Sequence, residues 1–192
     1  MLEQAAGKPW EDLIQEKVFQ PLGMLDTGMG PPGSPDAPDQ PWGHFSLGSG
    51  WEPVEPGPNA DLPPALNPSN GVHTTLIDYS RYLLDHLAGT RGENGLVTAD
   101  TYLRLHTSRS GVGYALGWAI QNRPWALGFA LTHNGSNKLW WATVWIAPEL
   151  DFATVALVNA AEANGRNVGL EAADYAAVVL ITRMQDLLAQ GL

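Results

Sequence analysis

The sequence predicts an α+β fold in which helices flank an antiparallel sheet. Helical periodicity of apolar residues appears before residue 107 and again over 169–190. Between these regions, residues 112–159 contain four consecutive segments rich in aromatic and β-branched residues, separated by turn signals. The order of helices, loop, helices, meander and helix is typical of an α+β chain. With 192 residues, the chain is long enough for one ordinary domain with a hydrophobic core.

The first predicted helix covers residues 9–19, where apolar side chains recur at i, i+3, i+4 and i+8. Pro9 suits the first turn, because the N–H that proline lacks would have no helical partner there. Pro21 and Gly23 follow as a signal that the helix ends.

Residues 28–68 are expected to form a long irregular loop. Most of the 15 prolines of the chain lie in this stretch, together with many glycines. Because proline fixes φ and removes a backbone donor, helix and central strand are both disfavoured here. We interpret the stretch as a surface excursion wrapped over the core, although long loops of this kind also carry function in some domains.

Two further helices precede the strands. The first covers residues 74–87 and begins with Thr74 or Thr75 as its cap. The second covers residues 98–106, with Thr98 as its cap.

The four predicted strands are GYALGWAIQ, WALGFALT, LWWATVWIAP and DFATVALVN. Asn134-Gly135 and residues 148–151 are the natural chain reversals, because their residue types tolerate the backbone angles of tight turns. Trp140 and Trp141 follow the first of these reversals and must point to opposite faces of a strand, which leaves one of them available to line a cleft.

Composition excludes several classes of partner. Ten basic residues face 20 acidic ones, for a formal net charge of −10. Such a chain lacks the basic surface that binding to nucleic acid or to an anionic membrane requires. There is no cysteine, and the N-terminal residues lack the basic flank and apolar run of a signal peptide. We expect a soluble chain without an export signal of its own. The compartment of a longer parent protein stays open, and export to the periplasm is one of the options.

Metal and cofactor sites are not indicated. The five histidines are dispersed and never form the spacing of a metal motif; they are His44, His73, His86, His106 and His133. His86 and His106 are interpreted as helix-surface residues. No phosphate-binding loop and no Gly-x-Ser-x-Gly elbow occur, so the sequence predicts no cofactor.

Several stretches, taken in order, resemble one family. They are LEQAAGKPWEDLIQEKVFQPLGMLDTGM, NPSNGVHTTLIDYSRYLLDHL, YALGWAI, LTHNGSN and VWIAPELDFATVALVNA. Together they are similar to the serine β-lactamase-related family, which contains class C β-lactamases, DD-peptidases (penicillin-binding proteins) and related esterases. PLGMLDTGM and the His-Asn-Gly block are the specific parts, and Trp42-Gly43-His44 is similar to a Gly-Tyr or Gly-His site of the family.

The resemblance implies a transpeptidase-like fold and a set of site residues. His133-Asn134-Gly135 would be the third active-site motif, the counterpart of Lys-Thr-Gly on the strand that edges the cleft. The backbone N–H of Ser136 would form half of the oxyanion hole. In this place a histidine can donate to the substrate or steady the base, and Gly135 leaves room for a substrate backbone. A polar turn follows this strand directly in the family, so the turn and the cleft wall can be the same element.

Two other motifs of the family are absent from the sequence. No serine has a lysine three residues later, and no tyrosine has an asparagine two residues later. The resemblance therefore implies that residues 1–192 are the C-terminal portion of a β-lactamase-like serine hydrolase, which acts on an amide or ester through an acyl-enzyme. The chain alone is expected to be inactive, because loss of the nucleophile costs about a millionfold in turnover. The alternative is a non-catalytic binding module that retains the fold.

The same incompleteness leads to an expectation about partners. If the first strands of the family fold are missing, DFATVALVN becomes an exposed sheet edge, and such edges recruit other chains. We expect either a homodimer or a complementing N-terminal partner at this edge.

Overall fold

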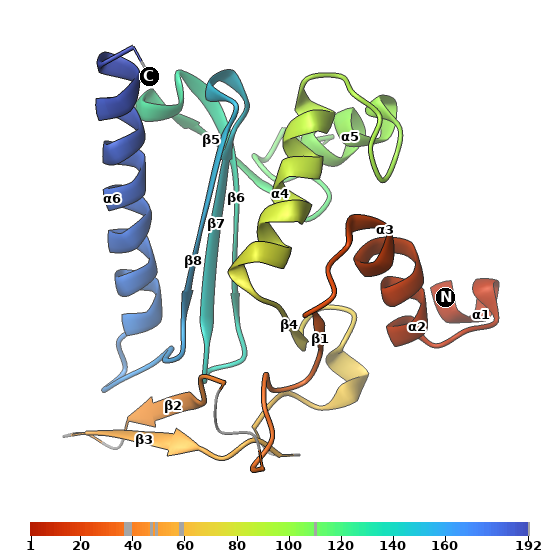
Figure 1. Cartoon of the computed structure of the whole chain (residues 1–192), viewed down its shortest axis with the longest axis vertical. Helices are drawn as coiled ribbons and strands as arrows, with labels where there is room; N and C mark the ends of the chain where they lie inside the picture. Colours follow the sequence, from red (N-terminus) through yellow and green to blue (C-terminus); the bar gives the residue numbers. More distant parts are fainter. Residues whose placement is uncertain (37–39, 47, 49, 58–59, 110, 192) are drawn as a thin grey trace. The chain divides into compact units, whose positions relative to one another are not determined.

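The computed structural model describes residues 1–36, 40–46, 48, 50–57, 60–109 and 111–191 (Figure 1). Parts of the predicted 28–68 loop therefore lie outside the described residues. The chain divides into two compact units. Unit 1 contains Met1–Tyr82, Gly135–Trp141 and Val158–Gly169, and unit 2 contains Leu83–Asn134, Ala142–Leu157 and Leu170–Leu192.

Unit 1 begins with a group of short helices. They are α1 (Leu2–Ala6), α2 (Trp10–Ile14), the π-helical segment η1 (Gln15–Phe19) and α3 (Gln20–Leu22). The last three are continuous, so the helix predicted over 9–19 is confirmed and runs one turn further. It ends at Gly23, whose φ of 68° is left-handed and suits a glycine.

Two small antiparallel pairs complete the regular structure of unit 1. Strand β1 (Gly28–Met29) pairs with β4 (Val72–His73), and β2 (Gly43–Ser46) pairs with β3 (Trp51–Val54). A 3₁₀ turn, η2, covers Pro64–Leu66. The 28–68 stretch is thus not irregular throughout. The hairpin tolerates its proline because a two-stranded ribbon leaves one edge of each strand without ladder bonds.

Most of unit 2 is built on one sheet with the strand order β5-β6-β7-β8, in which consecutive strands are neighbours; the last residues of β6 and β8 and the first of β7 are counted in unit 1. The strands are β5 (Ala119–Arg123), β6 (Gly128–Ser136), β7 (Trp141–Ala147) and β8 (Phe152–Val158). The antiparallel register of β5 and β6 runs from Arg123↔Gly128 to Ala119↔Thr132. Four strands therefore occur as predicted, but β5 begins six residues later than expected, because residues 115–118 form a turn, and β6 begins and ends later than expected.

One predicted reversal is confirmed and the other is wrong. The 3₁₀ turn η4 (Pro148–Leu150) reverses the chain, as η3 (Pro124–Ala126) does between β5 and β6. Asn134-Gly135, in contrast, lies inside β6 and makes no turn.

The chain reverses three residues later, where the side chain of Asn137 organises the turn. Its Oδ1 accepts hydrogen bonds from the N–H groups of Leu139 (3.1 Å) and Trp140 (3.0 Å). Lys138 takes a left-handed φ of 77°. An asparagine side chain that bonds to the backbone two or three residues on forms a turn as effectively as Asn-Gly does, so the dipeptide alone misplaces it.

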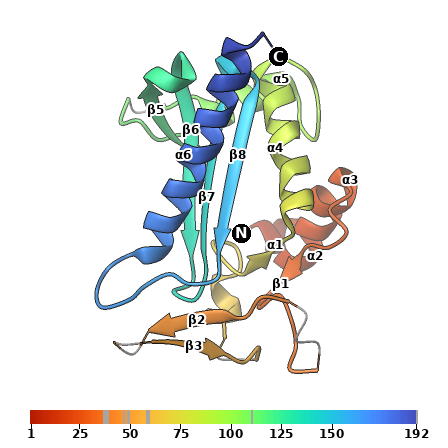
Figure 2. The ribbon, with the colours of Figure 1, turned by 60° about the vertical axis from the view of Figure 1, so that its left-hand side comes forward.

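Helices cover both sides of the sheet (Figures 1 and 2). Helix α6 (Val168–Ala189) lies on one side, and α5 (Ala99–His106) lies on the other with the C-terminal part of α4 (Leu76–Thr90). The predicted caps are confirmed. Thr75 Oγ1 accepts from the N–H of Asp78 at 3.1 Å, and Thr98 Oγ1 accepts from the N–H of Thr101 at 3.4 Å.

The core of unit 2 lies between this sheet and its helices. Val144 and Ile146 of β7 are 2% and 0% exposed. Ala173 and Ala177 on α6 are also buried, and their small side chains allow a helix to pack closely on a sheet. Each large side chain buried in this way contributes about 1.5–3 kcal/mol. Among the described residues, no helix is both long and apolar enough to span a bilayer.

Candidate active site

The three residues of the predicted third motif and Ser136, the residue after them, occupy the end of β6. Strand β6 runs to Ser136, whereas its register with β5 ends at Ala119↔Thr132. Residues 133–136 therefore extend past the last pair that β5 makes. A strand segment beyond the end of its neighbour offers backbone N–H and C=O groups to an extended ligand.

His133 is exposed on this segment and contacts Tyr114. Its Nε2 lies 3.0 Å from the Tyr114 hydroxyl, and the two rings meet edge to face with centroids 6.1 Å apart. Both residues belong to unit 2. Tyr114 is not among the residues predicted from the sequence, because the two residues are 19 positions apart and only the fold brings them together.

Asn134 is anchored to the neighbouring strand. Its Oδ1 accepts a hydrogen bond of 2.9 Å from the hydroxyl of Thr143 on β7, a residue that is only 2% exposed. Successive side chains of a strand point to opposite faces, so the side chains of Asn134 and His133 lie on opposite faces of the sheet.

Gly135 has open space beside it. A Cβ built on this residue would meet no described atom within 4 Å, and the backbone is extended rather than left-handed. The chain's own packing therefore does not require a glycine here.

The hydroxyl of Ser136 is committed to the turn that follows β6. It donates to the carbonyl of Trp140 at 2.8 Å and accepts from the N–H of Lys138 at 3.0 Å. A hydroxyl held this way stabilises a turn rather than attacking a substrate. Any part of Ser136 in catalysis falls to its backbone N–H, as the resemblance implies.

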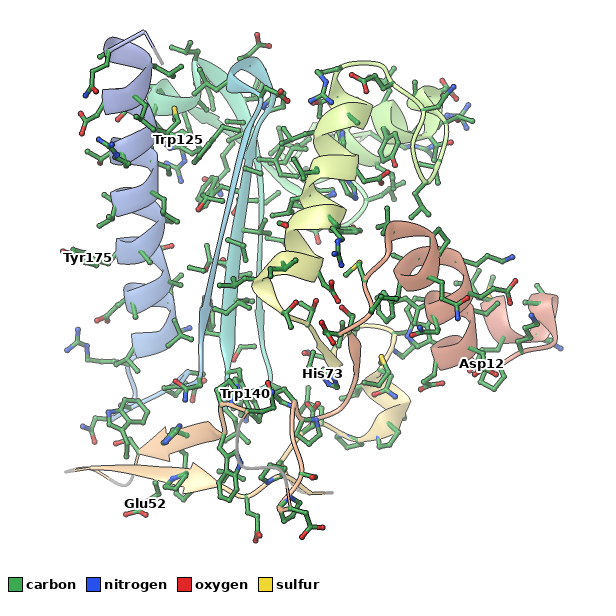
Figure 3. The ribbon with its side chains drawn as sticks, viewed as in Figure 1. Asp12, Glu52, His73, Trp125, Trp140 and Tyr175 are labelled. Carbon is green, nitrogen blue, oxygen red and sulfur yellow. The ribbon has the colours of Figure 1, made fainter. Side chains whose placement is uncertain are left out.

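Trp42-Gly43-His44, the other stretch noted in the sequence, packs on that same turn within unit 1. The N–H of His44 donates to the carbonyl of Asn159 at 2.9 Å, and the amide of Asn159 donates to the carbonyl of Trp42 at 3.0 Å. A Cβ at Gly43 would lie 2.8 Å from the ring of Trp140, which Figure 3 labels. These contacts give the stretch a structural role.

Asp78 is a buried carboxylate that was not predicted from the sequence. It is 1% exposed, and its Oδ2 accepts from the N–H of Asp26 (2.7 Å) and the hydroxyl of Thr27 (3.0 Å). Its Oδ1 pairs with Arg81, one helical turn later. The i, i+3 spacing of acid and arginine was the available signal, although the same spacing is common on helix surfaces. The carboxylate ties the segment after α3 to α4.

His86 and His106 are not helix-surface residues, contrary to the prediction. His86 is 4% exposed, and its Nδ1 lies 2.8 Å from Nε2 of His106. The rings of Tyr102 and Trp118 meet the His86 ring edge to face, with centroids 5.6 and 5.2 Å away. Burial, with His106 adding to it, lowers the pKa of His86 to about 4, and burial also lowers the pKa of His106.

The described residues hold no group of three or more His, Asp or Glu side chains that would bind a metal ion. The two nitrogens of the histidine pair are 2.8 Å apart, which suits a direct hydrogen bond.

Comparisons with known proteins identify proteins with a similar fold. The family model described as Beta-lactamase matches residues 1–178. A D-amino acid amidase from Ochrobactrum anthropi SV3, complexed with L-phenylalanine amide, has a TM-score of 0.71 at 16% identity, over 98% of this chain and 54% of that one. An octameric penicillin-binding protein homologue from Pyrococcus abyssi has a TM-score of 0.66 at 19% identity, over 94% and 40%. A class C beta-lactamase has a TM-score of 0.59 at 20% identity, over 84% and 49%.

These matches define how much of the fold the chain contains. It spans roughly half the length of the solved structures, between 40% and 54% of each. No curated protein sequence matches it. The resemblance noted in PLGMLDTGM and in the His-Asn-Gly block is confirmed by the family match over residues 1–178. The chain belongs to the Beta-lactamase family and has its hydrolase-type α+β fold.

Proposed function

We infer that this chain forms one wall of the active site of a serine hydrolase that cleaves an amide or ester through an acyl-enzyme. The attacking hydroxyl and its lysine would come from residues outside this sequence. The observation that carries the inference is the end of β6, where His133-Asn134-Gly135 extends past β5 with open space beside the glycine. Family membership supports the hydrolase, and the absence of Ser-x-x-Lys from the 192 residues is the reason why the nucleophile would have to lie outside them.

The chemistry of such a wall is electrostatic. A substrate laid along residues 133–136 would pair with the backbone of β6. The N–H of Ser136 would face the oxygen that becomes negative in the transition state, and a donor of this kind is worth about 10²–10³ in rate. Gly135 would allow the substrate backbone to approach closely.

A small amide is the first substrate class to test. Among the structural neighbours is a D-amino acid amidase, which makes D-phenylalanine amide a suitable probe. We expect this probe, added to the ¹⁵N-labelled chain, to shift the backbone amide signals of residues 133–136 more than those of α6. Uniform or absent shifts at millimolar probe would contradict a ligand site on β6.

Turnover by this chain alone is not expected. A fluorophosphonate probe should leave all serines unlabelled, and nitrocefin and p-nitrophenyl acetate should be hydrolysed no faster than in buffer. The physical reason is that a missing nucleophile costs about a millionfold. Covalent labelling of any serine in this chain would overturn the inference that the nucleophile lies elsewhere.

A non-catalytic binding module is the second candidate, and the absence of both Ser-x-x-Lys and Tyr-x-Asn favours it. The coding sequence upstream of Met1 separates the two candidates. An in-frame Ser-x-x-Lys there supports the hydrolase, and its absence, combined with binding of the probe on β6, supports the binding module.

A further inference from the structure

Tyr114 is held in place by a turn directly before β5. The N–H of Ala115 donates to the carbonyl of Trp118 at 2.8 Å, and Gly117 takes a left-handed φ of 90° within this turn. The turn folds the chain back so that Tyr114 forms an antiparallel bridge with Ala119, the first residue of β5. Its backbone is therefore positioned by local hydrogen bonds.

This placement brings Tyr114 to the first residue of the free end of β6. The register of β5 with β6 ends at Ala119↔Thr132, and His133 is the next residue along. The Tyr114 hydroxyl lies 3.0 Å from Nε2 of His133. The tyrosine thus contacts the first residue of β6 that has no pairing partner on β5.

The direction of this hydrogen bond follows from acidity. A phenol O–H is a stronger acid than the N–H of neutral imidazole, and an unprotonated imidazole nitrogen is a strong acceptor. The favoured arrangement has Tyr114 donating and Nε2 of His133 accepting. Since neutral imidazole carries one proton, that proton then resides on Nδ1.

We propose that Tyr114 is a positioning residue for the third motif. By holding Nε2 of His133 it restricts the ring and leaves the Nδ1–H as the donor that faces a substrate or a neighbouring catalytic group. The catalytic meaning of this role rests on the proposed function. The hydrogen bond and the tautomer, however, exist in the chain without any substrate, so they are tested separately.

The test is the tautomer of His133, read from its side-chain ¹⁵N signals at about pH 8. We expect the Nδ1–H form to dominate in the unmodified chain. In Tyr114→Phe, the Nε2–H form, which free imidazole side chains prefer, should dominate instead. The variant keeps the ring and removes one oxygen from a half-exposed side chain, so the fold should persist.

Tyr175→Phe is the matched control, because Tyr175 is 73% exposed on α6 and lies away from β6 (Figure 3). It should leave the His133 tautomer unchanged. A dominant Nε2–H form in the unmodified chain overturns the proposal, and this measurement needs no variant to fold. Identical tautomers in the unmodified chain and Tyr114→Phe overturn it as well.

A second arm separates this proposal from the proposed function. D-phenylalanine amide should bind Tyr114→Phe several-fold more weakly than Tyr175→Phe, measured by the amide shifts of residues 133–136. If the tautomer changes as expected but neither variant binds the probe, the positioning role stands and the assigned substrate class fails. Equal binding to both variants, with the tautomer changed, overturns the role of Tyr114 in ligand recognition.

Discussion

At the scale of single residues, two glycines of the chain differ in the space around them. A Cβ at Gly43 would lie 2.6 Å from the Cβ of Leu139 and 2.8 Å from the ring of Trp140. A Cβ at Gly135 would meet nothing within 4 Å. The first glycine is required by packing inside the chain, whereas no contact inside the chain requires the second.

We expect Gly135→Val to fold normally and to lose ligand binding. Valine favours extended backbone and finds free space, so the free energy of unfolding should change by less than about 0.5 kcal/mol. Affinity for D-phenylalanine amide should fall at least about tenfold, because the branched side chain fills the space beside β6. Gly43→Ala is the control and should lose about 1–3 kcal/mol of stability through overpacking. Unchanged affinity in Gly135→Val would count against a ligand at this position.

Asp78 provides a second prediction at this scale. Asp78→Ala removes the acceptor for the Asp26 N–H and the Thr27 hydroxyl, and it leaves Arg81 without its carboxylate partner. We expect a loss of about 3 kcal/mol in urea unfolding. The matched control is Asp100→Ala, which breaks an exposed pair with Arg104 and should cost less than about 1 kcal/mol. Equal losses in the two variants would show that Asp78 has no special structural role.

At the scale of elements, the contact between α4 and α5 contains a pair of imidazoles, of which His86 is buried and His106 is partly buried. Nδ1 of His86 and Nε2 of His106 are at hydrogen-bond distance, so one neutral ring donates to the other. Asp85 and Tyr102 are the other titratable groups at this contact, and they are hydrogen-bonded to each other. Placing a positive charge on both imidazoles would put two N–H groups face to face.

Because of this histidine pair, we expect the free energy of unfolding of the protein to fall in mild acid. The folded pKa of His86 is lowered to about 4, whereas an unfolded histidine titrates near 6.5. Below about pH 6.5 the unfolded chain binds protons that the folded chain excludes, so stability falls until about pH 4. The full loss from His86 is about 3 kcal/mol, and His106 acts in the same direction.

The measurement is the urea midpoint at pH 5 and pH 7.5. In the unmodified chain the midpoint should be lower at pH 5. In His86→Gln, which keeps a hydrogen-bonding side chain but cannot be protonated, the difference between the two pH values should shrink. An unchanged difference in the variant would assign the acid sensitivity to other groups.

At the scale of the whole molecule, the sheet ends in an unprotected strand. β8 is the last strand in the sheet order, and its sequence from Phe152 to Val158 contains no charged residue. Natural edge strands usually carry charges, prolines or bulges that prevent pairing with other chains. Thr154 on this strand is 5% exposed, and its hydroxyl has no partner among the described residues.

We propose that a second copy of the chain pairs with β8 in solution. Light scattering at micromolar concentration should then give a mass of twice the 20.6 kDa of the chain. Leu157→Lys places a charge on a 41% exposed position of β8 and should give the monomer without loss of secondary structure. A monomeric unmodified chain would contradict self-pairing and leave a complementing N-terminal chain as the partner to test.

The sequence by itself determined the local elements of this protein and its family. Periodicity placed the helix at 74–87, the hydroxyl of Thr98 predicted where α5 begins, and aromatic and β-branched runs located all four strands. PLGMLDTGM and the His-Asn-Gly block indicated the family that the match over residues 1–178 shows. These features depend on residues within a few positions of one another, and such short-range interactions can be read directly from the order of the residues.

Only the tertiary structure decided which side chains meet. Periodicity within one helix cannot reveal that His86 faces His106 on another helix, and the acid-arginine spacing cannot reveal that Asp78 is buried. Asn134-Gly135 belongs to β6 because Asn137 organises the turn three residues later. Tyr114 contacts His133 because the pairing of β5 with β6 ends at Thr132, the residue before His133. Each of these contacts depends on how separate elements pack, and packing energy comes from surfaces that are distant in the sequence.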